Sequence, residues 1–498
     1  MIQTSVSPTL DVLFRRILAR KPDAPALIDP INKKRVTGQA PRHLTFGEAD
    51  RAISALAAHF IEAGLPNNSV IAVQLPNTVE LMLTVLAAHR AGLVVAVFPL
   101  LWRQAELTVA LNRTGARAIV TTGKIDGVSH ADLAMNAAAE AFSIRHVCGF
   151  GTDLPEGMAS LEVALENRSS TTRAVVEDGR KAAIISFDVT AEGFRPIPRT
   201  HLHLIAGGLT LSLQSELPQG STLMSAFAPT SFAGMTSSLV LWLLTGGTLA
   251  LHHPFDSEAL EQQIREHSCG TLVAPAQMAL RMSEIDLASR LPTLRNIFAL
   301  WRAPEQVSSS LVWTADQVAL TDVYLFGEAG MFGARRTGDG MPAPILPGRL
   351  AAPQDAAAAT IAGEVFLTPK GTLALRGAMV TPAAYSPPPP SGSLVAQPRD
   401  FVDTEYAARL DRSTGAICIT SPPAGIMAVG GYRFLSGELQ EWARRLGQGA
   451  LLTALPDRLS GHRLAGRAQD NARARAALNA LGLNPLMVEA FRDRTNPV

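Results

Sequence analysis

The stretch VIAVQLPNTVELMLTVLAAHRAGLVVAVF, residues 70–98, decides the fold. It opens on a β-branched apolar run at residues 70–75, continues as an apolar helix at 78–91 and closes on a second apolar run at 93–98. Two runs of strand length joined by a helix predict a right-handed βαβ unit with parallel strands. The chain is therefore expected to contain a parallel sheet covered by helices.

The same alternation continues on both sides of this unit. Helices are expected at residues 48–63 and 104–114 and a strand at 118–122. A second array starts at strand 183–187 and continues through helices 201–214, 235–244 and 257–267 and strands 221–226, 248–252 and 271–274. Two arrays of this kind in tandem predict two stacked βα subdomains.

The remainder of the chain has shorter strands and more glycine and proline. Strands at 364–368 and 372–376 predict a small β-rich lobe, and residues 385–399, which include the run SPPPP, predict a stiff linker. A hairpin at 416–420 and 426–429 and helices at 437–446 and 471–481 follow. We therefore divide the chain into a large domain, residues 1–410, and a small α+β domain, residues 411–498.

Composition narrows the class of protein. A chain of 498 residues is too long for one hydrophobic core, and 47% hydrophobic against 17% charged residues is typical of a folded protein. A net charge of +1 with dispersed basic residues argues against nucleic acid and anionic membranes as partners. Cys148, Cys269 and Cys418 have no metal-ligand spacing and are expected to be reduced. The sequence shows neither a signal pattern nor an apolar run long enough for a membrane span, so a cytoplasmic location is expected.

Several short motifs stand in a fixed order along the chain: LTFGE at 44–48, LPN at 75–77, YLFGEAG at 324–330, RG at 376–377 before AY at 384–385, and GGY at 430–432 before Glu438. In sequence and spacing they resemble the adenylate-forming superfamily of AMP-binding acyl-CoA synthetases. The resemblance implies an α/β fold in which two stacked βα subdomains and a β-rich lobe form a large N-terminal domain. A small α+β C-terminal domain, shorter than the family norm, follows.

The chemistry implied by the resemblance has two half-reactions. A carboxylate attacks the α-phosphate of ATP to give an acyl-adenylate and pyrophosphate, and a thiol then displaces AMP. The implied cofactors are ATP and Mg²⁺, with CoA or the pantetheine of an acyl carrier protein as the thiol, and no structural cofactor. The implied partners are a small-molecule acyl substrate, an acyl carrier protein and, as an open alternative, a second copy of the chain.

The phosphate-binding loop of the family corresponds here to FDVTAEGFRPIPRTH at 187–201. Such loops present backbone N–H groups to phosphates, and only Thr190 and Gly193 match that pattern as nucleotide-binding residues. Arg195 is the nucleotide-binding substitute for the loop lysine, and Arg199 is the alternative, which we assign a catalytic role. Asp188 and Glu192 place negative charge where a polyphosphate would arrive.

Three further positions of the nucleotide site are altered in this sequence. The family's ribose-binding aspartate corresponds to Tyr406, which offers one hydroxyl in place of a carboxylate. The charged hinge motif corresponds to SPPAG at 421–425, where two prolines stiffen the chain. The family's C-terminal catalytic lysine has no counterpart, because Lys370 is the last lysine of the sequence.

Other positions match the family. Glu328 corresponds to its Mg²⁺-associated, catalytic glutamate. Tyr324 and Ala303 correspond to residues beside the adenine, although Tyr324 also reads as an ordinary core residue. The residues that correspond to the family's substrate pocket are Phe232, Gly234, Trp301 and Phe326. Ordinary core packing would explain each of them equally well.

Three functions remain open at this point. The chain is a carboxylic acid–thiol ligase (AMP-forming) for an apolar fatty or aromatic acid, or a non-catalytic acyl- or acyl-thioester-binding accessory protein derived from such a ligase. The third alternative is a protein that accepts a preformed adenylate or acyl thioester and performs transfer only. The whole-chain plan favours the first, and the altered nucleotide positions favour the second.

Overall fold

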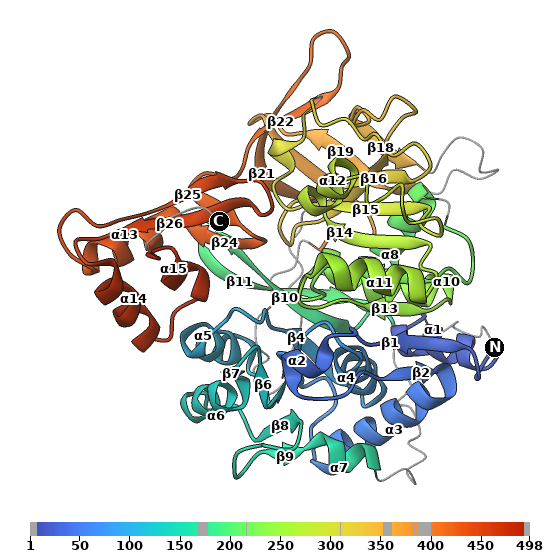
Figure 1. Cartoon of the computed structure of the whole chain (residues 1–498), viewed down its shortest axis with the longest axis vertical. Coiled ribbons are helices and arrows are strands. Elements are labelled where there is room, and N and C mark those ends of the chain that lie inside the picture. The colour runs from blue at the N-terminus through green and yellow to red at the C-terminus, as the bar shows by residue number, and fades with distance from the viewer. Residues whose placement is uncertain are drawn as a thin grey trace.

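A computed structural model of the chain describes residues 7–166, 178–215, 217–308, 310–351, 361–381, 385 and 400–492. Two sheets, a β-rich lobe and a small C-terminal unit follow one another from blue to red in Figure 1. The predicted fold class is confirmed. Of the described helices, none is long and apolar enough to cross a membrane.

The first sheet is parallel except at one edge. Its strand order is β11-β10-β4-β3-β5-β8-β9, and β10 and β11 form an antiparallel hairpin at the edge. The strands are β3 (Val70–Val73), β4 (Val94–Val97), β5 (Ala118–Thr122), β8 (His146–Phe150), β9 (Ala159–Ser160), β10 (Ala182–Thr190) and β11 (Gly193–Thr200). The helices around them are α3 (Phe46–Glu62), α4 (Val79–Arg90), α5 (Gln104–Thr114), α6 (His130–Glu140) and α7 (Leu161–Glu166).

Alternate side chains of one strand enter two different cores. Ile71 and Val73 pack into the core that contains α3 and α4, whereas Val70 and Ala72 pack into the core that contains α5 and α6. This alternation follows from the period of two along a strand. Helix α4 is buried along its whole length, which explains why its sequence is mostly apolar, and the charged residues Glu80 and Arg90 are buried with it.

The second sheet has the order β17-β16-β15-β14-β12-β13-β1-β2, with antiparallel strands at both edges. Its strands are β1 (Pro25–Ile28), β2 (His43–Thr45), β12 (Leu223–Ser225), β13 (Leu249–Leu251), β14 (Thr271–Pro275), β15 (Asn296–Trp301), β16 (Ala319–Leu325) and β17 (Met331–Arg335). Its helices are α1 (Leu10–Leu18), α2 (Lys33–Thr37), α8 (His201–Ser215), α9 (Phe232–Met235), a π-helical turn (Thr236–Val240), α10 (Leu241–Thr245), α11 (Ser257–Glu266), α12 (Ala276–Glu284) and a 3₁₀ turn (Pro304–Gln306).

One core joins the two sheets. It contains residues of both sheets together with α4, α8 and α10, so these helices lie between the sheets. A second core lies on the far face of the second sheet, under α11 and α12. The resulting layers of helix, sheet, helix, sheet and helix are the two stacked βα subdomains that the sequence predicted.

The lobe is a five-stranded antiparallel sheet. Its strands are β18 (Gly348–Ala351), β19 (Ile361–Leu367), β20 (Thr372–Arg376), β21 (Phe401–Leu410) and β22 (Ile417–Ser421). Because β22 pairs with β21, residues 417–421 belong to this sheet, and the predicted boundary after residue 410 falls inside a strand pair. Apart from Tyr385, the predicted linker at 385–399 lies outside the described residues.

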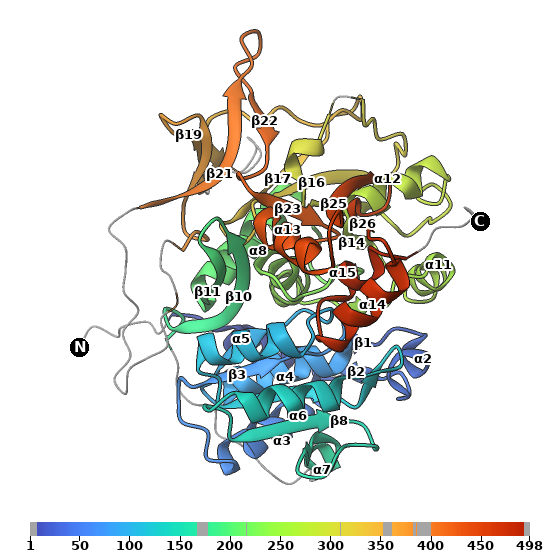
Figure 2. The same ribbon diagram turned by 90° about the vertical axis from the view of Figure 1, so that its left-hand side faces the viewer.

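The C-terminal unit lies beside the β10–β11 hairpin in both views (Figures 1 and 2). It consists of β23 (Ile426–Val429), β24 (Tyr432–Leu435), α13 (Ser436–Arg445), β25 (Leu451–Asp457), β26 (Gly461–Arg467), α14 (Asn471–Ala480) and α15 (Pro485–Glu489). The predicted hairpin between 416–420 and 426–429 is wrong, because β23 pairs with β24. Gly430 and Gly431 have φ values of 54° and 96° and form that two-residue turn, which favours glycine at both positions.

Candidate functional site

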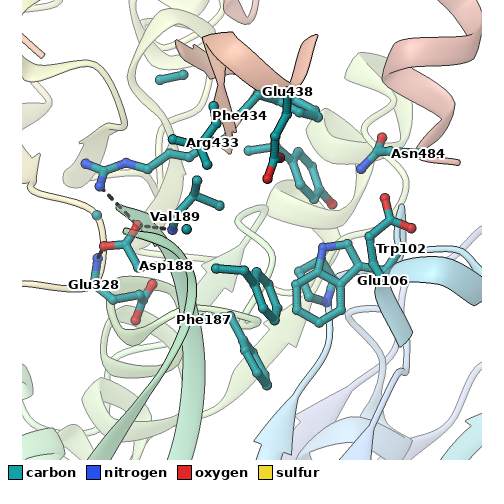
Figure 3. Close-up of a pocket in the computed structure, with 18 of the residues that line it drawn as sticks. Trp102, Glu106, Phe187, Asp188, Val189, Glu328, Arg433, Phe434, Glu438 and Asn484 are labelled. Atoms are coloured by element: carbon teal, nitrogen blue, oxygen red, sulfur yellow. Dashed lines mark hydrogen bonds and ion pairs between the residues drawn. The ribbon is translucent and has the colours of Figure 1, made fainter. Parts of the chain in front are cut away.

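A pocket of about 880 Å³ lies between the larger part of the molecule and the C-terminal unit. One wall is formed by α5, the β10–β11 hairpin and residues 227–233, and the other by β24, α13 and α15. Figure 3 shows side chains from both walls directed into the same space. The site is therefore built from segments that are several hundred residues apart in the sequence.

The phosphate-loop segment is a regular hairpin in the structure. The loop expected at residues 187–201 is occupied by the end of β10 and by β11, and Thr190 pairs with Gly193 at the tip of the hairpin. The Thr190 hydroxyl donates to the Gly193 carbonyl at 3.3 Å, and Arg195 pairs with Glu192 at 3.5 Å. Of these residues, Glu192 and Gly193 line the pocket. Backbone groups that pair in a ladder are not available as a cradle for phosphates.

Asp188, on β10, is the centre of a polar cluster. Its carboxylate accepts hydrogen bonds from the backbone N–H of Val189 at 2.8 Å and of Glu328 at 2.7 Å. The Arg433 guanidinium of the C-terminal unit lies 3.0 Å from the same carboxylate (Figure 3). The negative charge at the phosphate-loop position is thus neutralised by the chain itself.

Arg433 also reaches Tyr406, the residue that the sequence analysis aligned with the family's ribose-binding carboxylate. It donates to the Tyr406 hydroxyl at 2.8 Å, and both side chains are largely buried. Burial alone would lower the pKa of Arg433, but the Asp188 carboxylate and the Tyr406 phenol outweigh it and hold that pKa above its ordinary value. Burial raises the pKa of Tyr406, against the opposing effect of Arg433. Both groups therefore keep their protons at neutral pH.

Glu328 is buried at the pocket wall, with 6% of its surface exposed. One carboxylate oxygen, Oε2, accepts from the Ser186 hydroxyl and from the backbone N–H of Phe232, the latter at 2.9 Å. Burial raises the pKa of Glu328 to about 7, although Arg199 and Ser186 oppose the shift. The group can therefore be protonated or ionised near neutral pH, as a proton-transfer residue requires.

Arg199 lies behind Glu328 and does not line the pocket. Its guanidinium is 3.7 Å from the centre of the Phe232 ring and donates to the backbone carbonyls of Met379, at 2.6 Å, and of Glu328. Burial lowers the pKa of Arg199 to about 10, against the carboxylates of Glu328 and Asp188. Arg199 therefore holds the backbone of Glu328 in place from the side that faces away from the pocket.

The other predicted site residues are packed inside the protein. Trp301 donates to the Asp322 carboxylate at 2.7 Å, and Tyr324 stacks on Phe332 at 5.0 Å. Phe326 packs edge-to-face against Tyr406 at 5.3 Å. The predicted residues that do not line the pocket are Thr190, Arg195, Arg199, Phe232, Gly234, Trp301, Ala303, Tyr324, Phe326 and Tyr406. Glu328 and Gly193 are the two that do.

An aromatic wall was missed by the sequence analysis. The Trp102 and Phe194 rings are 5.2 Å apart, and Phe187 stacks on Phe194 at 5.1 Å. Tyr432 of the C-terminal unit packs against the same core, and Trp442 of α13 lines the facing side. A signal was present, because Phe187 and Phe194 flank a short turn and residues so placed meet across a hairpin.

The donor atoms at this site do not fit a Mg²⁺ ion. Oε2 of Glu328 already accepts two hydrogen bonds, and Asp188 is paired with Arg433. In the described part of the chain, no group of three or more His, Cys, Asp or Glu side chains is placed to hold a metal ion. Mg²⁺ is usually held by one or two carboxylates together with waters and substrate phosphates, and because Glu328 and Asp188 are both engaged by the chain we derive no step through it here.

Comparison with known proteins assigns the family. The model of the AMP-binding enzyme family matches residues 14–382. The chain belongs to this family. It is 26% identical over 301 residues to a plipastatin synthase polypeptide of Bacillus subtilis, a match that covers 59% of this chain and 10% of that protein. It is 27% identical over 166 residues to the medium-chain fatty-acid–CoA ligase of Escherichia coli, covering 32% of this chain and 29% of that protein. The matched part thus spans under a third of each of these two relatives.

Solved structures of other proteins have the same fold as this AMP-binding protein. MbtA of Mycobacterium smegmatis has a TM-score of 0.66 at 19% identity and covers 96% of this chain and 90% of its own. The fused adenylation–PCP di-domain NpsA-ThdA from Klebsiella oxytoca has a TM-score of 0.69 at 16% identity, covering 97% and 93%. At such identities the likeness shows the fold alone.

Proposed function

We propose that this AMP-binding family member binds an apolar acyl group carried as a thioester and does not activate acids with ATP. The observation that carries the proposal is the position of Arg433. It joins Asp188, at the phosphate-loop position, to Tyr406, at the ribose position, at 3.0 Å and 2.8 Å. A side chain of the C-terminal unit thereby occupies two polar groups, the Asp188 carboxylate and the Tyr406 hydroxyl, at positions aligned with the family's nucleotide site.

The pocket supports an apolar ligand. Trp102, Phe187 and Phe194 offer aromatic surface on one side, and Trp442 offers it on the other. Burial of apolar surface in such a pocket contributes roughly 25 cal/mol per Å² to binding. One relative is a medium-chain fatty-acid–CoA ligase, and this supports an acyl group as the ligand of the pocket. We place the protein in the cytoplasm on the sequence features given above.

A second candidate is the AMP-forming acid–thiol ligase itself, acting on a fatty or aromatic acid with ATP, Mg²⁺ and CoA or a carrier-protein pantetheine. Glu328 favours it, because the glutamate of the family motif is retained at the pocket wall with a pKa of about 7. This function requires Arg433 to leave Asp188 and Tyr406 before ATP can bind.

Thermal unfolding of the full chain tests the proposal. Octanoyl and benzoyl thioesters of pantetheine are compared with ATP and Mg²⁺, because a ligand bound only by the folded state raises Tm. We expect a thioester to raise Tm and ATP to leave it unchanged. The Trp442→Ala variant should lose the thioester effect. Phe142→Ala, which removes an aromatic side chain that is 91% exposed and outside the pocket, should keep it. A rise with ATP and none with either thioester would overturn the proposal.

A further inference from the structure

The β25–β26 hairpin of the C-terminal unit is covered by helices on one face only. Leu452 of β25 and Leu464 of β26 are buried in the core of the unit, together with residues of α13, α14 and α15. Side chains alternate between the two faces of a strand, so the residues next to Leu452 and Leu464 point away from these helices. In the described part of the chain, β25 and β26 pair only with each other. The second face of this two-stranded sheet is therefore not packed against the helices of the unit.

Leucines and arginines lie side by side on this second face. The antiparallel register places Leu451 opposite Arg467 and Leu455 opposite Arg463. Residues directly opposite each other in a strand pair lie on the same face of the sheet, with Cβ atoms about 4.5–5.5 Å apart. Each leucine therefore has an arginine beside it, and we call these four residues the outer face of the hairpin.

The leucines of the hairpin are largely exposed. Leu451 and Leu455 are 63% and 40% exposed, and Leu459, in the turn between the two strands, is 61% exposed. A single exposed leucine is common on a protein surface and needs no explanation. Three of them on one hairpin, bordered by basic residues, are typical of an interaction site for a protein or a membrane.

The hairpin carries positive charge. Residues 451–467 contain three arginines and one carboxylate, formally +2, whereas the whole chain carries +1. The carboxylate, Asp457, accepts hydrogen bonds from the backbone N–H groups of the turn residues Leu459 and Ser460, at 3.0 and 2.9 Å. Within the described residues, no carboxylate pairs with Arg467. The whole-chain charge, which argued against an anionic membrane as a partner, therefore does not describe this hairpin.

A lipid bilayer with anionic headgroups matches both features of the outer face. Leucine side chains gain free energy by entering the apolar layer, and a neighbouring arginine can keep its guanidinium at the level of the headgroups. Anionic headgroups attract each arginine that lies near the membrane surface. A second copy of the chain would bring two positively charged faces together, and a soluble phosphate ligand would leave the leucines in water.

The outer face is separate from the pocket, because none of residues 451–467 is among those that line it. We propose that the outer face of the β25–β26 hairpin docks the protein reversibly on the surface of an anionic lipid bilayer. The contact is peripheral, with the leucines in the outermost apolar layer and the arginines at the headgroups. It goes beyond the proposed function and does not depend on it.

Co-sedimentation of the full chain with lipid vesicles tests the proposal. Vesicles of phosphatidylcholine are compared with vesicles that contain equal amounts of phosphatidylcholine and phosphatidylserine. The hairpin variants are Leu451→Gln and Arg467→Gln. Their matched controls are Leu481→Gln, at a residue that is 57% exposed and follows α14, and Arg473→Gln, at an exposed residue of α14. The controls change the same residue types in the same unit, but on the helix that packs under the covered face of the hairpin.

We expect wild type to bind the mixed vesicles at least about tenfold more tightly than it binds phosphatidylcholine vesicles. Leu451→Gln and Arg467→Gln should each weaken binding by about three- to fivefold, and the two controls should leave it unchanged. Added salt should weaken the binding of wild type more than that of Arg467→Gln, which has one charge fewer at the membrane. Circular dichroism and the unfolding midpoint should match wild type in all four variants, since the substituted residues are exposed.

Failure of wild type to sediment with the mixed vesicles would overturn the proposal, and so would equal binding to both kinds of vesicle. Vesicle binding that both hairpin variants retain in full would place the contact elsewhere on the molecule and overturn it as well. A dimer that forms without lipid and is dissociated by Leu451→Gln, with no vesicle binding, would assign the outer face to a second copy instead. Binding to mixed vesicles that is weakened by both hairpin variants and by neither control supports the proposal.

Discussion

The Arg433 guanidinium lies 3.0 Å from the Asp188 carboxylate and connects the C-terminal unit to the first sheet. The two side chains are 13% and 9% exposed, so the pair is largely shielded from water. Removing one partner of a buried ion pair leaves the other charge uncompensated, at a cost of about 3–5 kcal/mol. This pair is therefore one of the contacts that hold the C-terminal unit over the pocket, together with the hydrogen bond from Arg302 to the Gly430 carbonyl.

The first prediction concerns that attachment. Arg433→Met should speed hydrogen exchange in residues 426–435, because β23 and β24 lose their anchor on β10. Arg444→Met is the matched control, since Arg444 pairs with Glu441 at an exposed site. Mass spectrometry of exchanged peptides gives the comparison. If both variants protect residues 426–435 as well as wild type does, the anchoring role is wrong.

The second prediction concerns Gly327, which has a φ of 57° next to Glu328. A Cβ atom there would collide with the Arg433 guanidinium and the Asp188 carboxylate. Gly327→Ala should therefore lower the unfolding midpoint more than Gly64→Ala does. Gly64 has a φ of 71° and nothing within 4 Å of an added Cβ. Gly64→Ala therefore introduces the same kind of backbone strain without a steric collision. If both variants lower the unfolding midpoint equally, the Arg433–Asp188 pair does not occupy the space beside Gly327.

The third prediction concerns pH. Glu328 has a pKa of about 7 in the folded protein against the ordinary value of 4.5, so the folded state binds its proton more tightly than the unfolded chain does. Stability is therefore lost as pH rises from about 4.5 to 7. Glu328→Gln removes this loss and keeps an acceptor for Ser186 and Phe232.

Unfolding in urea at pH 5 and pH 8 provides the measurement for Glu328. The stability of Glu328→Gln relative to wild type should increase between these pH values by up to about 3 kcal/mol, as the shift in pKa requires. The same shift in Glu106, raised to about 7 by burial, is present in both proteins and cancels in the difference. A difference that stays constant with pH would contradict the burial of an ionisable Glu328.

The layered fold could be predicted because its strands and helices are marked locally. Helix α5 was predicted at its observed bounds, Gln104–Thr114, since a capping interaction of Glu106 with the Arg103 N–H begins it and Gly115 ends it. Strands β25 and β26 were missed because only three of their fourteen residues are buried, and their periodicity is weak.

The site could be predicted only in part. Glu328, predicted from its motif, lines the pocket, but the contact of Arg433 with Asp188 joins residues that are 245 positions apart in the sequence. Nor does a single sequence distinguish a pocket aromatic from a core aromatic, as Phe326 and Phe187 show, because packing decides which of them faces the pocket.

The exchange of pyrophosphate into ATP, measured on the full chain with Mg²⁺ and a panel of fatty and aromatic acids, tests the central claim most directly. Occupation of Asp188 and Tyr406 by Arg433 predicts no exchange above the level without acid for wild type. Acid-dependent exchange by wild type, lost in Glu328→Gln, would contradict the account and identify the protein as an active acid–thiol ligase.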